Sequence, residues 1–428
     1  MIETTMVHVC IFEDREAEQL FPLTLTKPAY DLLLGSSTLF EKIFRHFGHA
    51  NISLHCRDYL KECNKKQHPG LSINTINMGT PCLFINSRVL LSEKLLDHLH
   101  SIDDKFNTLY TFKGQVVAAY VRGDLLEAFC ACLRTLPSSA QLIQVIRSKS
   151  ICKELESVHL IEYPWHLLSF NEEALRWDFQ FNNQPGIIKG EIKPFTALYN
   201  ENNIFIDKDT EIEDFVVLNA KPGPIYIENN VYIEANTRLE GPLYIGAHTQ
   251  ILGGKIKNSS IGRHCKVAGE VSASIFQSFS NKAHGGFIGN SYLGEWVNLG
   301  AFTTTSNLRN NYSPVTVHTH QGSIKTDERF LGSIIGDYVK TGIQTTLNTG
   351  TVISTGSALF DTGFHDKYIP PFSWGSPKNY ATHHLDAFFN TTAIMMNRRN
   401  RSLSDSQKQL LHFLFQHALR RPNESAFR

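Results

Sequence analysis

The sequence predicts an α/β domain followed by a parallel β-helix and a partly helical tail. Two observations lead to this fold class: aliphatic residues that recur every six positions, and a preceding segment in which short apolar runs alternate with amphipathic stretches. The six-residue period is carried by Ile227, Ile233, Leu239, Ile245 and Ile251, and it returns at Ile335, Leu347, Ile353 and Leu359.

A fixed short period is typical of a solenoid, because each repeat supplies one strand and its turn and stacks its aliphatic side chain on the copies in neighbouring coils. Alternation in an ordinary sandwich strand has a period of two and lasts only a few residues. Glycines follow several of the aliphatic residues, as at Gly246, Gly262, Gly294 and Gly336. We expect these glycines at the tight corners of the coils.

The α/β domain is predicted over residues 1–180. The apolar run 7–12 reads as a strand, 37–47 as a helix, and the later runs 82–85 and 116–121 as further strands. Strands that alternate with helices indicate an α/β sheet, which binds ligands at the carboxyl ends of its strands. This places Glu13–Arg15 and Asn86–Arg88 at the predicted ligand edge, and 163–178 is predicted to be the helix that links the two halves.

The solenoid is predicted over residues 200–365, with an insertion at 306–331 that has no aliphatic register. An insertion between coils belongs on the outside and is commonly a binding loop, and this one is long enough to reach a neighbouring chain. Residues 366–428 form the tail. Its amphipathic stretches fit a helix that shields the last coil, or a helix that binds a partner.

Composition excludes several classes of protein. The 41 basic and 41 acidic residues balance, so no general nucleic-acid or membrane surface is predicted. The eight cysteines lack the paired CxxC spacing of a zinc site, which favours buried free thiols in a reducing cytosol. There is no basic-then-apolar leader and no apolar run of membrane-spanning length, so we expect a soluble cytoplasmic protein.

Three stretches resemble the acetyltransferase domain of the bifunctional glucosamine-1-phosphate acetyltransferase/N-acetylglucosamine-1-phosphate uridylyltransferase. They are Asn281–His284 (NKAH), Phe287–Gly289 (FIG) and Asn298–Asn307 (NLGAFTTTSN). Over nearly its full length the chain resembles the alternative, divergent bacterial GlmU-like branch of that group, on phrases such as 22–28 (PLTLTKP), 84–88 (FINSR) and 372–375 (FSWG). The resemblance is specific in the middle of the solenoid and weak at the N-terminus.

The resemblance implies a left-handed β-helix, a homotrimer with an active site in each cleft, acetyl-CoA as co-substrate, and a sugar phosphate and a nucleotide sugar as ligands. Acetyl transfer from a thioester to an amine needs a base that takes up the ammonium proton near neutral pH, and histidine titrates in that range. We expect His284, in a small polar break between coils, to be this catalytic base. His318 and His320 of the insertion are the next candidates.

The family pattern also places substrate contacts at Phe287, Asn298 and Asn307, and backbone amides that hold the thioester near Ala301 and Gly342. Asparagine also suits solenoid corners, so a purely structural role for Asn298 and Asn307 stays open. Phe287 replaces a family tyrosine, and a family lysine expected about a dozen residues before His284 is missing, since 270–273 contains no basic residue. The identity of the acceptor sugar therefore stays open.

In the α/β domain the resemblance places a nucleotide at Arg15, Lys27 and Asn86. A typical nucleotidyltransferase has a glycine-rich loop after its first strand and an aspartate that holds Mg²⁺. Here the loop reads FEDRE over 12–16 without glycine, and the aspartate position holds Asn86. Either Glu13 or Asp14 supplies the Mg²⁺ ligand instead, or the domain binds a nucleotide sugar without turning it over.

The sequence thus predicts an acetyl-CoA-dependent N-acetyltransferase of amino-sugar phosphates, joined to a sugar-1-phosphate nucleotidyltransferase-like domain, in the synthesis of UDP-N-acetylglucosamine or a related cell-envelope precursor. Two alternatives stay open. One is a non-catalytic trimeric scaffold that binds a nucleotide sugar, and the other is an acyltransferase that acts on a different acceptor.

Overall fold

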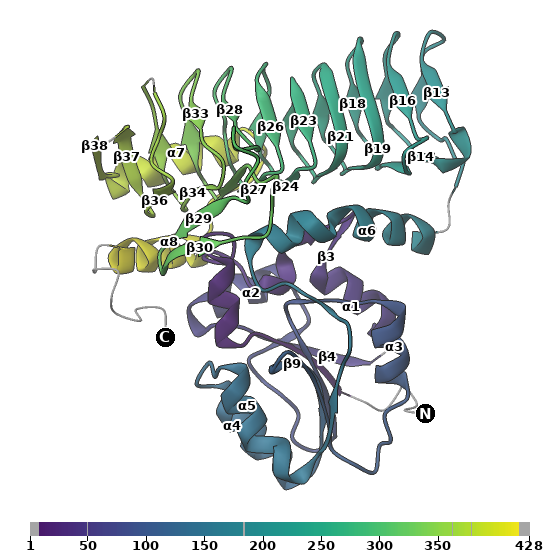
Figure 1. Ribbon diagram of the computed structural model, residues 1–428, viewed down its shortest axis with the longest axis vertical. Helices are drawn as coiled ribbons and strands as arrows, with labels where there is room; N and C mark the ends of the chain where they lie inside the picture. Colours follow the sequence, from purple (N-terminus) through teal and green to yellow (C-terminus); the bar gives the residue numbers. More distant parts are fainter. Residues whose placement is uncertain (1–7, 49, 183–184, 362, 378, 419–428) are drawn as a thin grey trace.

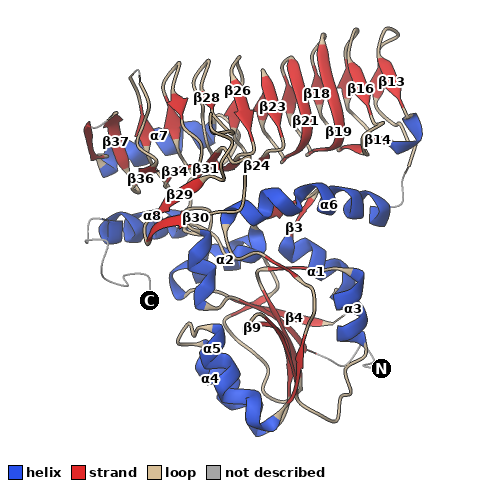
Figure 2. Ribbon diagram, viewed as in Figure 1, coloured by secondary structure: helices blue, strands red, loops and turns tan. Residues whose placement is uncertain are grey.

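The computed structural model of the protein describes residues 8–418 except 49, 183, 184, 362 and 378. Figure 1 shows the β-helix lying along one side of the α/β domain, with helix α6 (Pro164–Asn182) between them. Tail helices α7 (Leu385–Asn397) and α8 (Asp405–Ala418) lie beside the last coils (Figure 2). The predicted fold class, an α/β domain followed by a parallel β-helix and a helical tail, is confirmed. The end of the predicted tail, 419–428, lies outside the described residues.

The α/β domain is built on a seven-stranded sheet. Its strand order is β10 (Ile151–Glu154), β8 (Thr108–Phe112), β9 (Gln115–Val121), β6 (Cys82–Asn86), β1 (His8–Phe12), β4 (Asn51–His55) and β5 (Ser72–Ile73). Helices α4 (Asp124–Leu133) and α5 (Ser139–Ile146) pack on one face, and α1 (Leu39–Phe47) and α3 (Glu93–His100) pack on the other, while α2 (Lys61–Gln67) follows β4. Parallel strands β1 and β6 end side by side, with Phe12 opposite Asn86, so the predicted ligand edge exists.

The β-helix has three faces of parallel strands. The first contains β12 (Glu191–Ile192), β15 (Glu211–Ile212), β18 (Tyr232–Ile233), β20 (Gln250–Ile251), β22 (Lys266–Val267), β25 (Asn281–Lys282), β32 (Lys340–Thr341), β35 (Ala358–Leu359) and β37 (Ser373–Ser376), with β38 (Asn379–Thr382) at its end. The second contains β13 (Ala197–Tyr199), β16 (Val217–Asn219), the first parts of β19 (Thr237–Ile245) and β21 (Gly254–Ile261), β23 (Glu270–Ser272), β26 (Phe287–Gly289), β28 (Thr304–Thr305) and β33 (Thr346–Leu347).

The third face contains β14 (Ile204–Ile206), β17 (Ile225–Ile227), the second parts of β19 and β21, β24 (Ile275–Ser278), β27 (Tyr292–Glu295), β31 (Ser333–Ile335), β34 (Thr351–Ile353) and β36 (Tyr368–Ile369). Register confirms the six-residue period, since Ile227 pairs with Ile245, three repeats later. The stacked aliphatic side chains are buried, with Leu239 at 0% exposure. The coils begin at β12 and end at β38, so the solenoid is longer at both ends than the predicted 200–365.

The glycines next to the aliphatic columns serve close packing rather than a special backbone conformation. Positive φ falls instead on larger residues such as His264 (57°) and Trp296 (59°). A Cβ on Gly262 would lie 1.9 Å from the carbonyl oxygen of Gln277, in the next coil. The expectation of glycine at these positions is correct, but its cause is the approach of the neighbouring coil.

The insertion and the tail both pack on their own chain. The insertion forms a hairpin of β29 (Thr316–Thr319) and β30 (Gly322–Lys325), whose Val315 and Val317 share a core with Leu20 and Leu23 of the α/β domain. Tail residue Phe388 packs on Phe372 at a corner of the last coils (ring centroids 5.3 Å apart), and Phe413 packs on Tyr59 of the α/β domain (5.1 Å). The tail therefore ties the two halves together instead of only shielding the last coil.

None of the helices in the described ranges is long and apolar enough to cross a membrane. The eight cysteines are free thiols, and Cys10, Cys56, Cys82, Cys130 and Cys265 are buried.

We predict that Leu239→Asp unfolds the β-helix, because it buries a carboxylate without a partner inside the aliphatic column. Lys255→Asp, at an exposed position of the adjacent coil, is the control and should leave the melting temperature within about 1–2 °C, since surface substitutions usually change stability little. Thermal denaturation followed by circular dichroism measures both. Equal melting of the two variants would contradict the assigned register.

Candidate functional site

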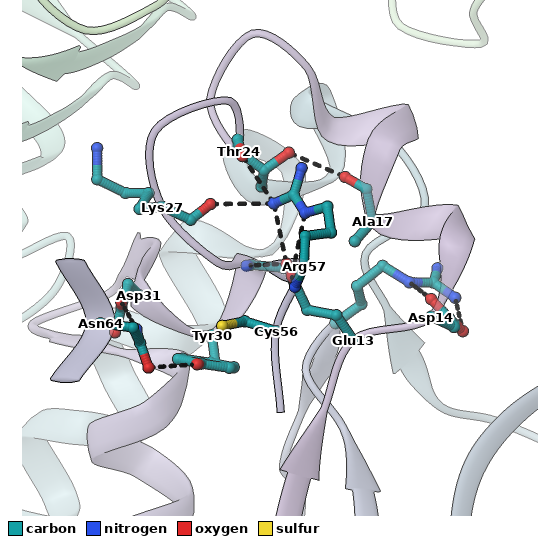
Figure 3. Close-up of polar contacts among 12 residues, drawn as sticks. Glu13, Asp14, Ala17, Thr24, Lys27, Tyr30, Asp31, Cys56, Arg57 and Asn64 are labelled. Atoms are coloured by element: carbon teal, nitrogen blue, oxygen red, sulfur yellow. Dashed lines mark hydrogen bonds and ion pairs between the residues drawn. The ribbon is translucent and has the colours of Figure 1, made fainter. Parts of the chain in front are cut away.

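The predicted nucleotide edge of the α/β domain is closed by internal ion pairs. Glu13 is fully buried and pairs with Arg57, whose Nη2 lies 3.1 Å from Oε1 (Figure 3). The same guanidinium donates to the carbonyl oxygens of Thr24 (2.7 Å) and Lys27 (3.2 Å). Asp14, also fully buried, accepts two hydrogen bonds from Arg88, at 3.1 and 2.9 Å. Both carboxylates are thus satisfied within the domain.

Asn86 is likewise committed to internal contacts. Its amide nitrogen donates to Asp14 (2.7 Å) and to the carbonyl oxygen of Val116 (2.9 Å), and its oxygen accepts from the backbone N–H of Arg88 (3.0 Å). Arg15 is exposed and stands apart from this cluster. The structure therefore places Asp14 beside Asn86, and the two side chains are hydrogen-bonded to each other.

This arrangement does not fit a divalent cation. Mg²⁺ requires free carboxylate oxygens, and those of Glu13 and Asp14 are already bound by guanidinium groups. Burial, followed by the charge of Asp14, raises the pKa of the neighbouring Glu16 to about 7, which makes that carboxylate a poor ligand too. Within the described part of the chain, no group of three or more His, Cys, Asp or Glu side chains is arranged to hold a metal ion.

Lys27 points away from the Glu13–Arg57 pair, as Figure 3 shows, and contacts the β-helix instead. Its ammonium group bonds to Asp337 and lies 3.7 Å from Glu295, and it is only 5% exposed. Burial lowers the pKa of Lys27, but the two carboxylates outweigh burial and raise it overall, so the lysine stays charged. The predicted phosphate-binding lysine joins the two domains.

A second group of predicted residues lies along one corner of the β-helix, between its first and second faces. His284 is exposed at this corner, Ala301 occupies it one coil later, and Gly342 one coil after that. The backbone ties these coils together, since Phe302 N–H donates to Gly285 (2.9 Å) and Gln344 N–H donates to Ala301 (2.7 Å). We call this line of three residues the acyl edge.

The backbone N–H groups of the acyl edge differ in whether they already donate a hydrogen bond within the protein. Gly342 N–H donates to the carbonyl oxygen of Leu359 (2.7 Å) and is therefore already used. Ala301 N–H has no acceptor among the described residues. Its neighbour Phe302 is 63% exposed and stands against Gly285, so an apolar side chain flanks His284.

Two of the three predicted substrate contacts lie close together, since a Cβ on Gly289 would lie 2.5 Å from the ring of Phe287 and 2.8 Å from the side-chain nitrogen of Asn307, whereas Asn298 lies on a different face. Phe287 lies on the second face. Asn298 lies on the first face, where its side-chain oxygen accepts from Asn281 (3.3 Å). Asn307 lies at the far corner of the second face and donates to Asn290 (2.7 Å), the structural use that the sequence left open.

Sequence reasoning missed Lys282, which occupies an inward position of the first face, in register with the aliphatic Val267 and Ile251. Its side chain is fully buried, and its ammonium group donates to the carbonyl oxygens of His284 and Gly285, the latter at 2.6 Å. Burial lowers its pKa to about 8. A lysine at an inward position that otherwise holds an aliphatic residue is the sequence signal that would have identified it.

Comparison with known proteins gives a family-model match in the α/β domain and several curated relatives. Residues 9–185 match the family model described as sugar nucleotidyl transferase, so this segment carries that family's domain. The bifunctional protein GlmU of Methanococcus aeolicus is 32% identical over 194 residues, which cover 45% of this chain and 41% of that protein. The bifunctional sugar-1-phosphate nucleotidylyltransferase/acetyltransferase of Sulfurisphaera tokodaii is 32% identical over 197 residues, covering 46% and 43%.

The matched segments thus span less than half the length of these curated relatives. Among solved structures, AntD, an N-acyltransferase from Bacillus cereus in complex with dTDP and 3-hydroxybutyryl-CoA, is 12% identical and covers 49% of this chain and 87% of its own. Its TM-score is 0.18, too low to bear on function.

We predict that Asp14→Ala destabilises the protein by about 3–5 kcal/mol, because it leaves the guanidinium of Arg88 buried and unpaired. Arg15→Ala, at the adjacent exposed position, should change stability by less than about 0.5 kcal/mol. Urea denaturation measures both values. A neutral Asp14→Ala would mean that the pair is open in solution and free to bind ligands.

Proposed function

We propose that the protein is an acyl-CoA-dependent N-acyltransferase of amino-sugar phosphates or nucleotide sugars, with acetyl-CoA as the acyl donor. The observation that carries the proposal is the acyl edge, where an exposed histidine, a free backbone amide and an exposed aromatic ring follow one another on consecutive coils. The bifunctional relatives named above support the same chemistry.

The proposed reaction begins with attack of the neutral amine of the acceptor on the thioester carbonyl, and His284 takes up the proton that the nitrogen loses as the C–N bond forms. The N–H of Ala301 donates to the oxyanion that develops there. Collapse of the adduct releases the CoA thiolate, and the proton held by His284 returns to that leaving group. Phe287, Asn298 and Asn307 are proposed to contact the acceptor.

We propose a homotrimer in which a neighbouring chain completes the site. Support comes from apolar side chains exposed beside the acyl edge on successive coils: Phe302 (63%), Ile343 (69%) and Phe364 (58%). Exposed apolar patches of this kind mark contact surfaces. A cytoplasmic role in supplying cell-envelope precursors belongs to the same proposal.

For the α/β domain we propose a structural or nucleotide-sugar-binding role without turnover. The internal ion pairs of Glu13, Asp14 and Lys27 support this role. Nucleotidyl transfer depends on a metal ion that screens charge and on free cations at the phosphates. A scaffold without any catalysis is the second candidate. Release of CoA from acetyl-CoA in the presence of glucosamine 1-phosphate, and of a panel of other amino sugars, separates the two.

We predict that His284→Ala lowers acyl transfer by about 10²- to 10⁴-fold, the range for loss of a general base. The melting temperature should stay unchanged, because the side chain is exposed. His318→Ala, on the insertion hairpin, is the matched control and should keep its activity. Loss in the His318 variant together with full activity in the His284 variant would move the base to the insertion.

We predict that Lys282→Met lowers kcat by about 10- to 100-fold, because the corner that presents His284 loses its two internal hydrogen bonds and small displacements at a reacting group are costly. The melting temperature should stay or rise, since an apolar side chain of similar length replaces a buried charge. Lys266→Met, one coil earlier on the outward side, should keep kcat. Unchanged kcat in Lys282→Met would exclude this positioning role.

A further inference from the structure

Two adjoining cavities lie between the α/β domain, the third face of the β-helix and the tail. The larger, of about 570 Å³, is lined among others by Thr38, Tyr226, Glu228 and Ser278, and the smaller, of about 390 Å³, by Lys66, Ser404 and Ser406. Gln67, Arg263 and Glu295 line both, so the two cavities adjoin at these residues, and together we call them the interdomain cleft. The larger cavity alone falls in the range of small-molecule sites, roughly 300–1,000 Å³.

Most charges around the cleft are satisfied by the protein itself. Arg45 pairs with Asp178 (3.1 Å), His68 with Asp31 (2.8 Å), and Lys27 with Asp337. Glu41 caps helix α1 through Thr38, and Glu295 accepts from Ser278 (2.6 Å). These groups shape the walls but have little charge left to offer a ligand.

Arg263 is different, because its guanidinium has no ion pair or side-chain hydrogen bond with any described residue. It stands where the two cavities join, and the exposed Lys66 lines the smaller one. Burial raises the pKa of the nearby Glu228 carboxyl, and the charge of Arg263 opposes that shift. A guanidinium whose partner is missing suits a phosphate or carboxylate, which it binds with two parallel hydrogen bonds.

The aromatic residues of the cleft argue against a nucleobase. Tyr226 is stacked between Phe205 (4.8 Å between ring centroids) and Tyr244 (6.0 Å), and Phe40 packs on His68 (4.4 Å) and Phe44 (5.5 Å). A base would need a free aromatic face to stack on. Hydroxyl, amide and carboxyl groups from Thr38, Gln67 and Glu228 dominate the remaining wall, and these groups exchange hydrogen bonds with a polyol.

We propose that the interdomain cleft binds a hexose monophosphate, with its phosphate on Arg263 and its hydroxyl groups on the polar wall of the larger cavity. The bound sugar phosphate contacts the α/β domain and the β-helix together and therefore stabilises their association. This site is separate from the acyl edge, which lies on another corner of the β-helix, and it does not depend on the proposed acyl transfer.

Isothermal titration calorimetry with glucose 1-phosphate, glucose and inorganic phosphate tests the proposal on the full-length protein. Glucose 1-phosphate has no amine to be acylated, so its binding is measured without turnover. We predict that it binds at least 10-fold more tightly than inorganic phosphate, that glucose shows no binding, and that Arg263→Gln weakens glucose 1-phosphate binding at least 10-fold.

Two control variants separate this site from other sources of binding. Arg134→Gln removes an exposed arginine that lines neither cavity of the cleft, and His284→Ala alters the acyl edge; both should bind glucose 1-phosphate as the unmodified protein does. Because Arg263 is exposed, its variant should keep the native circular dichroism spectrum and melting temperature.

Three outcomes would overturn the proposal. The first is no binding of glucose 1-phosphate at millimolar concentration, and the second is binding that Arg263→Gln leaves intact. The third is equal affinity for glucose 1-phosphate and inorganic phosphate, which would assign no role to the polyol wall. If His284→Ala loses binding while Arg263→Gln keeps it, the second outcome applies. The sugar phosphate would then bind at the acyl edge instead.

Discussion

The buried contact between Lys27 and Asp337 is the interaction on which the arrangement of the two halves depends. Asp337 reaches it because residue 294 is glycine: a Cβ there would lie 2.3 Å from the Asp337 carboxylate. The same carboxylate accepts from the backbone N–H of Glu295 (2.7 Å) and from Thr26, so one side chain joins two coils to the α/β domain. Removing either member would leave the other buried and unpaired, which is far more costly than loss of a surface ion pair.

Buried ion pairs of the same kind occupy the polar residues at the predicted nucleotide edge of the α/β domain. The cation that would neutralise a phosphate neutralises Asp337, and the carboxylates nearest the expected metal position neutralise Arg57 and Arg88. Each pair is buried, so a nucleotide or metal ion would have to displace a satisfied partner before binding. The domain has kept the sheet and its carboxyl-end geometry while using the polar residues of that edge for folding and docking.

The repeating parts of the fold could be predicted from the sequence because they depend on local periodicity. The aliphatic residues that recur every six positions between Ile227 and Leu359 predicted the coils, and the alternation of strands and helices predicted the sheet. Contacts between distant segments could not be predicted, since nothing near Lys27 indicates a partner some three hundred residues later. For the same reason the candidate site was only partly predicted: the acyl edge followed from its motifs, whereas the separation of Asn298 from Asn307 depends on which face each residue occupies.

The way the β-helix is covered leaves the acyl edge exposed. The third face is packed against the α/β domain and α6, through Tyr244, Tyr292 and Ile334. On the first face the tail reaches the later coils, where Arg399 donates to Asn281 (2.7 Å). The corner between the first and second faces keeps His284 and Phe302 exposed. The acyl edge therefore stays open to solvent on the later coils, whereas the third face and part of the first face are covered by the protein itself.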